Sequence, residues 1–504
     1  MTKLIDKKNL IKFLKGNKNK KIVLCHGVFD LVHYGHLKHF KSAKKYGDIL
    51  IVSITKDKFI KKGFNRPIFN EIKRAEYLSE IEIVDFVYIC ETESALDSIK
   101  TIKPNFYIKG PDYKNNELDT TKKIFLEKKF TKLFNGKIIY TEDKKFSSSE
   151  IINSKNLLNY NHIQKNFIEK IKKKYGFDFI KKEIDKFKKL RVLVIGELIF
   201  DQYCFGSIIG KSGKEPHLVF KENTADIHVG GVGVIARHIS SFVRQINVIS
   251  QFGNEIYLKK ILNQSFSKNI SNNFIFTNRI YKSIIKKRFI DEVSNYKMFG
   301  SYILPKKSSK NFHLKLISKI KSKVKSSDLV IVSDYGHHFL DKFSAAFISK
   351  IKVFKAVNTQ LNSSNVTTHS LQNYKNIDLV VINESELRTE FRNENKELKF
   401  LAYEKIKKSK IKHLIITQGK NGATLFRKNF LPVHCPAFVE KSIDKVGAGD
   451  AMLSMCALAI KQNLDSEIVL FLGSIASAIN VNTVGNKASV DYHQLERFLK
   501  FSLE

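Results

Sequence analysis

Short apolar segments alternate with helix-like segments in two separate stretches of this chain, and this alternation limits the fold more than any other feature. In the first stretch, residues 21–25 form an expected strand, followed by a glycine-containing turn and an expected helix from about Gly35 to Tyr46. Continuous apolar strands that alternate with helices predict a parallel sheet that helices cover on both faces. The other strands expected here are residues 48–55, 84–90, 105–110 and 137–140, with helical patterns such as 92–103 between them.

The second stretch repeats the pattern. It begins with an expected strand at 191–201 and ends with apolar helices near 449–462 and 466–480. Since 504 residues exceed what one hydrophobic core ordinarily holds, more than one domain is expected. The expected strands in between are residues 246–250, 328–336, 377–383 and 413–419.

A lysine-rich segment separates the two stretches. Residues 156–189 place apolar side chains at helical spacing and contain little Pro, Gly or Ser, which favours a helical connector over a flexible linker. The sequence therefore predicts an α/β chain with a first domain at 1–155, a connector at 156–189 and a second domain at 190–504.

Composition excludes several classes of protein. A chain with 43% hydrophobic and 27% charged residues is globular rather than disordered. No stretch approaches the roughly 18 uncharged apolar residues of a membrane span, and the N-terminus lacks the apolar core of a secretory signal. A cytoplasmic protein without a membrane partner is expected. The five cysteines form no C-x-x-C pair, which argues against a disulfide framework or a cysteine-rich zinc site: Cys25, Cys90, Cys204, Cys435 and Cys456.

The formal net charge of +39 suggests a polyanionic partner such as nucleic acid. However, the lysines are spread over nearly every segment, and the chain is rich in Ile, Asn and Phe and has no Trp. This pattern is typical of compositional drift of a whole sequence. A nucleic-acid partner is therefore not expected, although a basic nucleic-acid-binding protein stays the alternative from another class. A positive field would still help to collect phosphorylated substrates.

The segment HGVFDLVHYGHLKHF follows the first strand and so lies at a carboxyl strand end, where open α/β sheets bind ligands. His33 and His36 flank the start of a helix whose N–H groups favour phosphate, and Gly27 allows close approach of the backbone. Such donors stabilise charge on a phosphoryl group during transfer. Alternatively, one histidine caps the helix and the other is a surface residue. A zinc site would need a third ligand, and none presents itself nearby.

The string G-x-F-D-x-x-H-x-G-H resembles the nucleotidyltransferase superfamily, which includes cytidylyltransferases and the adenylyltransferase half of the heptose-activating enzyme. The resemblance runs from about residue 21 to residue 153 and implies a Rossmann-like domain. It implies that His33 and His36 stabilise the transition state at the α-phosphate while a sugar-phosphate oxygen attacks and pyrophosphate leaves, with Mg²⁺ assisting. Further residues matched to the nucleotide site are Gly27, Phe29, Asp30, Lys44, Arg66, Arg74, Lys109, Asp112, Ser147, Ser148 and Ser149.

A second glycine-containing helix start lies in DKVGAGDAMLSMCALAI, residues 444–460. The backbone N–H groups of Gly447, Ala448 and Gly449 can converge on a transferring phosphoryl group. Asp450 lies in the first turn, where a carboxylate can take the proton of an attacking hydroxyl. Alternatively, Asp450 merely complements the helix dipole.

The D-x-x-G-A-G-D pattern resembles the signature of ribokinase-like, PfkB-type sugar kinases, and other pieces follow in that family's order. The resemblance implies that Asp450 is the catalytic base and that ATP is the phosphate donor. It implies magnesium and phosphate binding by Asn383 and Glu386. It places Thr417, Gly419 and Gly422 at the ATP site, and Asp201, Gly230, Gly231 and Asp334 at the sugar.

Three departures concern this resemblance. Val234 replaces the usual Asn of G-G-x-x-N, Val446 replaces a common Thr, and Asn358-Thr359-Gln360 stands where heptose kinases have D-P-K. The ATP side is thus matched better than the sugar side. An active transferase joined to a degenerate, sugar-binding kinase domain stays as an alternative.

Together the two domains resemble the bifunctional ADP-heptose synthase family, with the usual domain order reversed. The resemblance implies a sugar kinase joined to a sugar-phosphate nucleotidyltransferase, which make an activated sugar for surface polysaccharide. The expected substrates are a sugar or sugar phosphate and a nucleoside triphosphate. ATP is favoured over CTP for the transferase by resemblance only, and self-association is left open.

Overall fold

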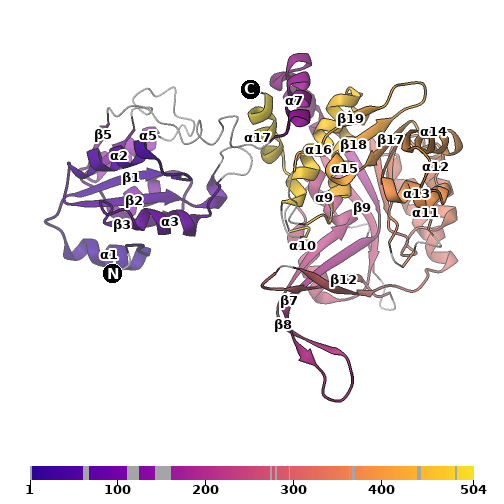
Figure 1. Cartoon of the computed structure of the whole chain (residues 1–504), viewed down its shortest axis with the longest axis horizontal. Helices are drawn as coiled ribbons and strands as arrows, with labels where there is room; N and C mark the ends of the chain where they lie inside the picture. Colours follow the sequence, from indigo (N-terminus) through magenta and orange to yellow (C-terminus); the bar gives the residue numbers. More distant parts are fainter. Residues whose placement is uncertain are drawn as a thin grey trace. The chain divides into compact units, whose positions relative to one another are not determined.

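The computed structural model divides the chain into two compact units, Met1–Asn159 and Tyr160–Glu504, and each is described by itself (Figure 1). Within them, the structure describes residues 3–60, 67–110, 124–141, 160–272, 275–277, 281–294, 296–362, 364–365, 369–439, 444–482, 485–487 and 489–503. In this part of the chain, no helix is long and apolar enough to cross a lipid bilayer.

The first unit contains a five-stranded parallel sheet in the order β3-β2-β1-β4-β5. Helices cover both faces: apolar side chains of α2 and α3 pack on one face, and those of α1 and α4 on the other. This confirms the predicted parallel α/β sheet. The strands are β1 (Ile22–Gly27), β2 (Ile49–Thr55), β3 (Phe86–Cys90), β4 (Phe106–Lys109) and β5 (Lys137–Tyr140). The helices are α1 (Lys7–Gly16), α2 (Tyr34–Lys44), the 3₁₀ turn Asp57–Phe59, α3 (Glu71–Ser79), α4 (Leu96–Ile102) and α5 (Ile124–Leu133).

The strand order places a switch point in the centre of this sheet. The chain moves outward from β1 to β2 and β3, and then returns to β4 on the other side of β1. Open α/β sheets bind ligands at the carboxyl ends of strands beside such a point. The turn after β1 and the start of α2 lie there.

The main sheet of the second unit has the order β10-β9-β6-β14-β15-β16-β17-β18-β19, with β11 paired to β9. It is parallel except at the β17–β18 and β18–β19 pairs. Its strands are β6 (Arg191–Gly196), β9 (Gln245–Phe252), β10 (Ile270–Ser271), β11 (Ile275–Thr277), β14 (Leu329–Asp334), β15 (Phe354–Thr359), β16 (Leu379–Asn383), β17 (His413–Thr417), β18 (Ala423–Phe426) and β19 (Val433–Cys435). Its helices are α9 (Val232–Ser240), α10 (Ile256–Ser265), α11 (Lys310–Val324), α12 (Lys342–Lys350), α13 (Glu384–Phe391), α14 (Leu398–Ser409), α15 (Ala448–Lys461), α16 (Ser466–Val481) and α17 (Tyr492–Leu503), with 3₁₀ turns at Leu371–Asn373 and Gly419–Asn421.

A separate four-stranded sheet, which we call the lid sheet, has the order β13-β12-β7-β8. Strands β7 (Leu198–Lys211) and β8 (Leu218–Gly231) form a long antiparallel hairpin that extends from the body of the unit (Figure 1). Strands β12 (Ile284–Asp291) and β13 (Lys297–Ile303) complete it. The sequence patterns did not predict this sheet.

The single strand expected at 191–201 is in fact two strands in two sheets. Gly196 ends β6 with φ +148°, and a Cβ at this position would overlap the carbonyl oxygen of Ser333 on the neighbouring strand. The chain therefore turns out of the main sheet at Gly196 and enters the lid sheet after Glu197. The apolar pattern continues through the turn because both strands are buried.

Helices α7 (His162–Lys174) and α8 (Phe177–Asp185) and the 3₁₀ turn Lys186–Lys189 occupy most of the expected connector. They pack within the second unit, where Phe167 lies 6.0 Å from Phe471 between ring centroids. The Tyr492 hydroxyl of α17 donates to Asp185 at 2.9 Å. These helices therefore extend the core of the second unit.

Candidate functional site

One candidate site is a cavity of about 1210 Å³ in the second unit, between the ends of the main-sheet strands and the lid sheet. A smaller, mostly apolar cavity of about 150 Å³ shares part of its wall and includes Gly422, Phe438 and Met452. The shape fits a polar phosphate and sugar region joined to a slot for a flat apolar group. Of the residues predicted from the sequence, those that line the large cavity are Asp201, Gly231, Asn383, Glu386, Thr417, Gly419, Gly447, Ala448, Gly449 and Asp450.

Asp450 lies in the first turn of α15 and is buried at the cavity wall. Both of its carboxylate oxygens lie 3.0 Å from the hydroxyl of Tyr335. Burial raises the pKa of Asp450 to about 7, and the hydrogen bond from Tyr335 opposes that rise. A carboxylate that changes its protonation near neutral pH is suited to accept the proton of an attacking hydroxyl.

The turn before α15 brings backbone N–H groups to the cavity. Gly447 has φ +82°, and a Cβ there would overlap the side-chain oxygen of Asn486. Only glycine therefore fits without displacing a neighbour. The helix start at Ala448 and Gly449 is open to the cavity, which suits an anionic group.

Asn383 and Glu386 form a capping box at the start of α13. The Asn383 side chain accepts from the Glu386 N–H at 2.7 Å, and Glu386 accepts from the Asn383 N–H at 2.8 Å. Glu386 also accepts from the Leu361 N–H at 3.2 Å, and burial raises its pKa to about 7. One partly desolvated carboxylate beside a phosphate-sized space fits Mg²⁺ held mainly by phosphates and water, since a dication would favour the ionised carboxylate.

On another part of the cavity wall, two neighbours hold Asp201. Arg288 of β12 donates to one oxygen at 2.5 Å, and the Asn486 amide donates to the other at 3.0 Å. Gly230 lies directly against this carboxylate but does not line the cavity, whereas Gly231, with φ +57°, does. Asp201 therefore has a fixed orientation at the cavity wall.

Asn486 carries no motif that would have marked it in the sequence. Its side chain is 2% exposed and lines the cavity. Its amide donates to Asp201, while its Oδ1 is buried without a hydrogen-bond partner among the described residues. Since this oxygen lies against Gly447, the Asn486 side chain joins the Asp201 wall of the cavity to the turn before α15.

The lid sheet supplies cationic groups that no sequence signal marked. Lys286 of β12 is 6% exposed and lines the cavity, with its ammonium 5.2 Å from the ring centroid of Tyr335 and 5.5 Å from that of Tyr302. In the described part of the unit, no carboxylate lies within ion-pair distance of this ammonium. Burial lowers its pKa. Lys297 of β13 pairs with Asp444 at 2.6 Å.

The three departures from the kinase pattern have different surroundings. Val234 is buried in α9 with apolar neighbours and does not reach the cavity. Asn358 donates to the Val381 carbonyl at 2.8 Å and so links β15 to β16. Asn358, Gln360 and Val446 all line the cavity, so three of the altered positions face the ligand space.

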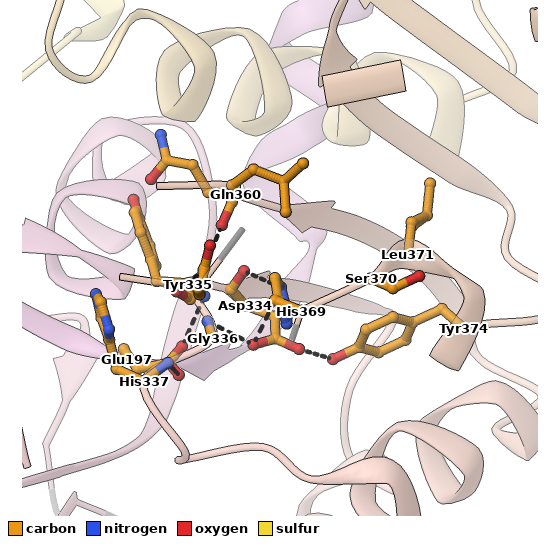
Figure 2. A network of polar contacts seen from close by, with 12 residues as sticks. Glu197, Asp334, Tyr335, Gly336, His337, Gln360, His369, Ser370, Leu371 and Tyr374 are labelled. Carbon is orange, nitrogen blue, oxygen red and sulfur yellow. Dashed lines mark hydrogen bonds and ion pairs between the residues drawn. The ribbon is translucent and has the colours of Figure 1, made fainter. Parts of the chain in front are cut away.

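Asp334 is not among the residues that line the cavity, contrary to the predicted sugar contact. It lies in a buried polar network (Figure 2), where it accepts from the Tyr374 hydroxyl at 2.7 Å and from the Gly336 N–H at 3.1 Å. Glu197, which no motif marked, accepts from the backbone N–H groups of Tyr335 at 3.0 Å and His337 at 3.1 Å. Burial, together with the charge of Asp334, raises the pKa of Glu197 to about 8. Because Tyr335 lines the cavity, this network fixes part of the cavity wall.

In the first unit, His33 and His36 form a capping box at the start of α2. The Nδ1 of His33 accepts from the Gly35 N–H at 3.1 Å, and the Nδ1 of His36 accepts from the His33 N–H at 3.3 Å. The rings stack with centroids 4.0 Å apart. An Nδ1 that accepts fixes the proton of a neutral ring on Nε2, so each ring carries an N–H donor there. Helix capping therefore uses Nδ1 of each ring, whereas the predicted phosphate contact would use Nε2.

The residues before this helix form a tight turn. Phe29 has φ +47° and packs against His36 and Phe40, while a Cβ on Gly27 would press against the Phe29 ring. Asp30 is buried and accepts from the backbone N–H groups of Ile68, at 2.6 Å, and of Phe69. Among the described contacts, Asp30 serves to fix the loop.

Lys44 lies at the wrong end of the sheet for the predicted nucleotide contact. It ends α2, and its ammonium donates to the Asp48 carbonyl at 2.7 Å and pairs with Asp85. Asp48 stands just before β2 and is therefore at the amino edge. Since α2 begins at the carboxyl edge with His33 and runs back along the sheet, its last residue cannot reach that site.

Arg74 and Lys109 are both buried, and each pairs with a carboxylate: Asp57, which is partly exposed, and Glu127, which is buried. Arg74 is fully buried: it pairs with Asp57 at 2.6 Å and donates to the carbonyls of Thr55, Phe69 and Val28. Lys109 pairs with buried Glu127 at 3.1 Å. Both lie near the carboxyl ends of strands, but the contacts described above join both cations to groups of the protein itself. Arg66, Asp112, Ser147, Ser148 and Ser149 lie outside the described residues.

The second unit thus has the fold and the helix-start cavity of a phosphoryl-transfer enzyme for small polar substrates. The model of the pfkB family carbohydrate kinases matches residues 189–491, more than half of the chain, and the chain belongs to that family. The Cytidylyltransferase-like family model matches residues 24–154. The order is therefore a cytidylyltransferase-like domain followed by a PfkB domain.

Curated relatives match part of the chain. Bifunctional protein HldE of Campylobacter jejuni (strain ATCC 700819) is 44% identical over 115 residues, which is 22% of this chain and 25% of that protein. Bifunctional protein HldE of Aliarcobacter butzleri is 39% identical over 140 residues, which is 27% of this chain and 29% of that protein. The chain spans about a quarter of the length of the curated relatives it matches.

Solved structures match the second unit's fold. The ribokinase of Thermotoga maritima has a TM-score of 0.51 and 17% identity, covering 62% of this chain and 99% of that one. Phosphofructokinase-2 of Escherichia coli, in complex with potassium, has a TM-score of 0.50 and 16% identity, covering 62% and 100%. At these identities the likeness concerns the fold, which is ribokinase-like as expected.

Proposed function

We propose that this chain is a bifunctional enzyme that phosphorylates a sugar or sugar phosphate in its second domain and transfers a nucleotide to a sugar phosphate in its first. We propose that residues 1–155 form the first domain and 190–504 the second, with 156–189 as the helical segment that joins them. Because the cysteines form no disulfide pattern, we propose that the enzyme acts in the cytoplasm. The product would be a nucleotide-activated sugar of the ADP-heptose type for surface polysaccharide. The partial similarity to HldE proteins supports this reading.

One observation carries the kinase half: Asp450 stands at the start of α15, on the wall of a cavity that also holds the open helix turn and Glu386. In this proposal the γ-phosphoryl group of ATP lies at the backbone N–H groups of residues 447–449. Mg²⁺ would neutralise the phosphates near Glu386 and Asn383. Asp450 takes the proton of the sugar hydroxyl, and the smaller cavity beside Thr417 and Gly422 receives the base.

The lid-sheet cation at Lys286 favours a substrate that carries a negative group. The charges of Asp201, Glu197 and Asp450 offset only part of the burial of this ammonium, so a bound anion would stabilise it further. A sugar phosphate held between Asp201 and Lys286 would do so. Lys286→Met should raise the KM for the sugar phosphate at least tenfold and leave the KM for ATP within about twofold. Lys287→Met, on the opposite face of β12, is the matched control, because side chains alternate along a strand.

For the first domain, we infer that the Nε2–H groups of His33 and His36 stabilise the transition state at the α-phosphate of ATP. The capping contacts at Nδ1 support this, since they hold both rings in one orientation at the switch point of the sheet. The same two donors would stabilise the α-phosphate of CTP equally well, so transfer from ATP and from CTP must be compared by assay.

Because Gln360 and Val446 depart from the kinase pattern, a second function is considered: an active transferase joined to a degenerate kinase domain that binds sugar. The first experiment is therefore phosphate transfer from ATP by the purified full chain across sugars and sugar phosphates, including heptose 7-phosphate. Turnover that disappears in Asp450→Asn supports an active kinase. Sugar binding without turnover on any substrate would support the degenerate domain instead.

A further inference from the structure

Tyr335 belongs to the buried polar network beneath the cavity (Figure 2), and its hydroxyl also contacts the candidate base Asp450. It follows β14, a central strand of the main sheet, and its side chain is 4% exposed. Its hydroxyl lies 3.0 Å from each carboxylate oxygen of Asp450. Among the described residues, no other side chain donates a hydrogen bond to this carboxylate.

The backbone of Tyr335 is fixed from three sides. Its N–H donates to Glu197 at 3.0 Å, and its carbonyl accepts from Asn362 at 3.1 Å and from Asn365 at 2.7 Å. The next residue, Gly336, has φ +67°, and its N–H donates to Asp334. A side chain whose backbone is held in this way can fix the position of another group.

We propose that Tyr335 is a positioning residue for the kinase reaction, and that its hydroxyl holds the Asp450 carboxylate ionised and oriented toward the substrate hydroxyl. The inference rests on the proposed function. In this reaction the substrate oxygen bonds to the γ-phosphorus of ATP, the bond to the bridging oxygen breaks to leave ADP, and Asp450 takes the hydroxyl proton. Tyr335 acts through Asp450 and takes no part in bond making.

The charges around Asp450 show why this donor matters. Burial raises the pKa of Asp450, as do the charges of Asp201 on β7 and Glu386 on α13, whereas Tyr335 and Lys286 on β12 lower it. Burial also keeps the pKa of the Tyr335 phenol well above its usual range, so the hydroxyl remains a donor. The other charged groups that line the cavity are Arg288, Lys297, Lys420, Asp444 and Lys445.

The test is the pH dependence of kcat for Tyr335→Phe. A hydrogen bond to a charged group contributes on the order of 1.5 kcal/mol, about one pKa unit. The acidic limb of the profile should therefore move up by about one pH unit, with kcat at pH 6.5 reduced about tenfold and the loss shrinking as the pH rises. A loss of equal size at every pH would overturn the proposal. A change in the orientation of the Asp450 carboxylate, without a change in its ionisation, would lower kcat by the same factor at every pH.

Tyr374→Phe is the matched control. It also removes a buried phenol hydroxyl from the same network, but that hydroxyl donates to Asp334 rather than to Asp450. Its acidic limb should stay at the wild-type pH; the same shift in both variants would show that the effect comes from the network in general and would overturn the proposal.

Two further variants separate this inference from the proposed function. In an Asp450→Asn background, Tyr335→Phe should cause no additional loss, and an additional loss would contradict action through Asp450. Kinase activity that survives Asp450→Asn would instead refute the proposed base itself. If Tyr335→Phe does not fold, site-specific 3-fluorotyrosine keeps the ring and is a more acidic donor, so the limb should move down; an unchanged limb would overturn the proposal.

Discussion

The two candidate sites lie at equivalent places, the carboxyl ends of parallel strands, but their predicted charged residues make different contacts. In the second unit, predicted residues from distant segments, such as Asp201, Glu386 and Asp450, line one cavity. In the first unit, the predicted cations Lys44, Arg74 and Lys109 contact the protein's own carboxylates and carbonyls. A charged residue in a recognisable motif can therefore stabilise the fold instead of contacting the ligand.

The largest expected effect separates the two sites by activity. Asp450→Asn should reduce the kcat of sugar phosphorylation by roughly 10³-fold, because a general base contributes about 10² to 10⁴. Nucleotidyl transfer should stay unchanged in a coupled pyrophosphate-release assay. Loss of both activities would show that the two sites are not independent.

The reciprocal substitution tests the histidine pair. His36→Ala should lower kcat of nucleotidyl transfer by roughly 10²-fold, through loss of a donor to the α-phosphate, while phosphorylation is unaffected. His39→Ala on the same helix is the control, since His39 contacts Thr141. If His36→Ala and His39→Ala were equally active, the pair would be a helix cap only.

Arg74 should matter for stability rather than for nucleotide affinity. Arg74→Met removes the donor to the Asp57 carboxylate and to three backbone carbonyls, one of them fully buried, and should destabilise the first unit by about 3 kcal/mol. Hydrogen exchange along α3 in the full chain would measure this. Arg191→Met is the comparison in the second unit: its pair with Asp328 is solvent-exposed, so its effect on stability should be much smaller. A large rise in nucleotide KM with unchanged exchange would restore the binding role of Arg74.

The buried carboxyls of the second unit predict a pH dependence of stability. The folded-state pKa of Asp450, about 7, is above its unfolded value near 4, so the folded unit binds more protons between these values and loses stability as the pH rises. Asp450→Asn lacks this penalty. The difference in melting temperature, Asp450→Asn minus wild type, should therefore increase by a few degrees between pH 5 and pH 8. A constant difference would mean that Asp450 is not desolvated.

The smallest expected effect concerns Lys44. Because Lys44 lies at the amino edge of the sheet, Lys44→Ala should change the KM for the nucleotide by less than about twofold and stability by less than about 1 kcal/mol. A tenfold rise in the nucleotide KM would show that the sequence-based assignment was right after all.

The sequence predicted both parallel sheets because buried parallel strands read as continuous apolar runs, as at 48–55 and 377–383. It did not predict the lid sheet, whose strands mix polar and apolar residues without a regular period of two and pair across long intervals, as β7 does with β12. Residues in short motifs, such as Asp450, could be located. Lys286, Asn486 and Tyr335 could not, because their roles depend on tertiary neighbours.

The hydrogen bond between Asn486 and Asp201 joins residues 285 positions apart. The Asp201 wall of the cavity therefore depends on contacts that form at high cost in chain entropy and are expected late in folding. During synthesis, the turn before α15 also emerges late, so neither part of the cavity wall exists on a partly made second unit. The growing second unit should therefore bind no ligand in this cavity until residue 486 has left the ribosome, whereas the first unit can fold long before that point.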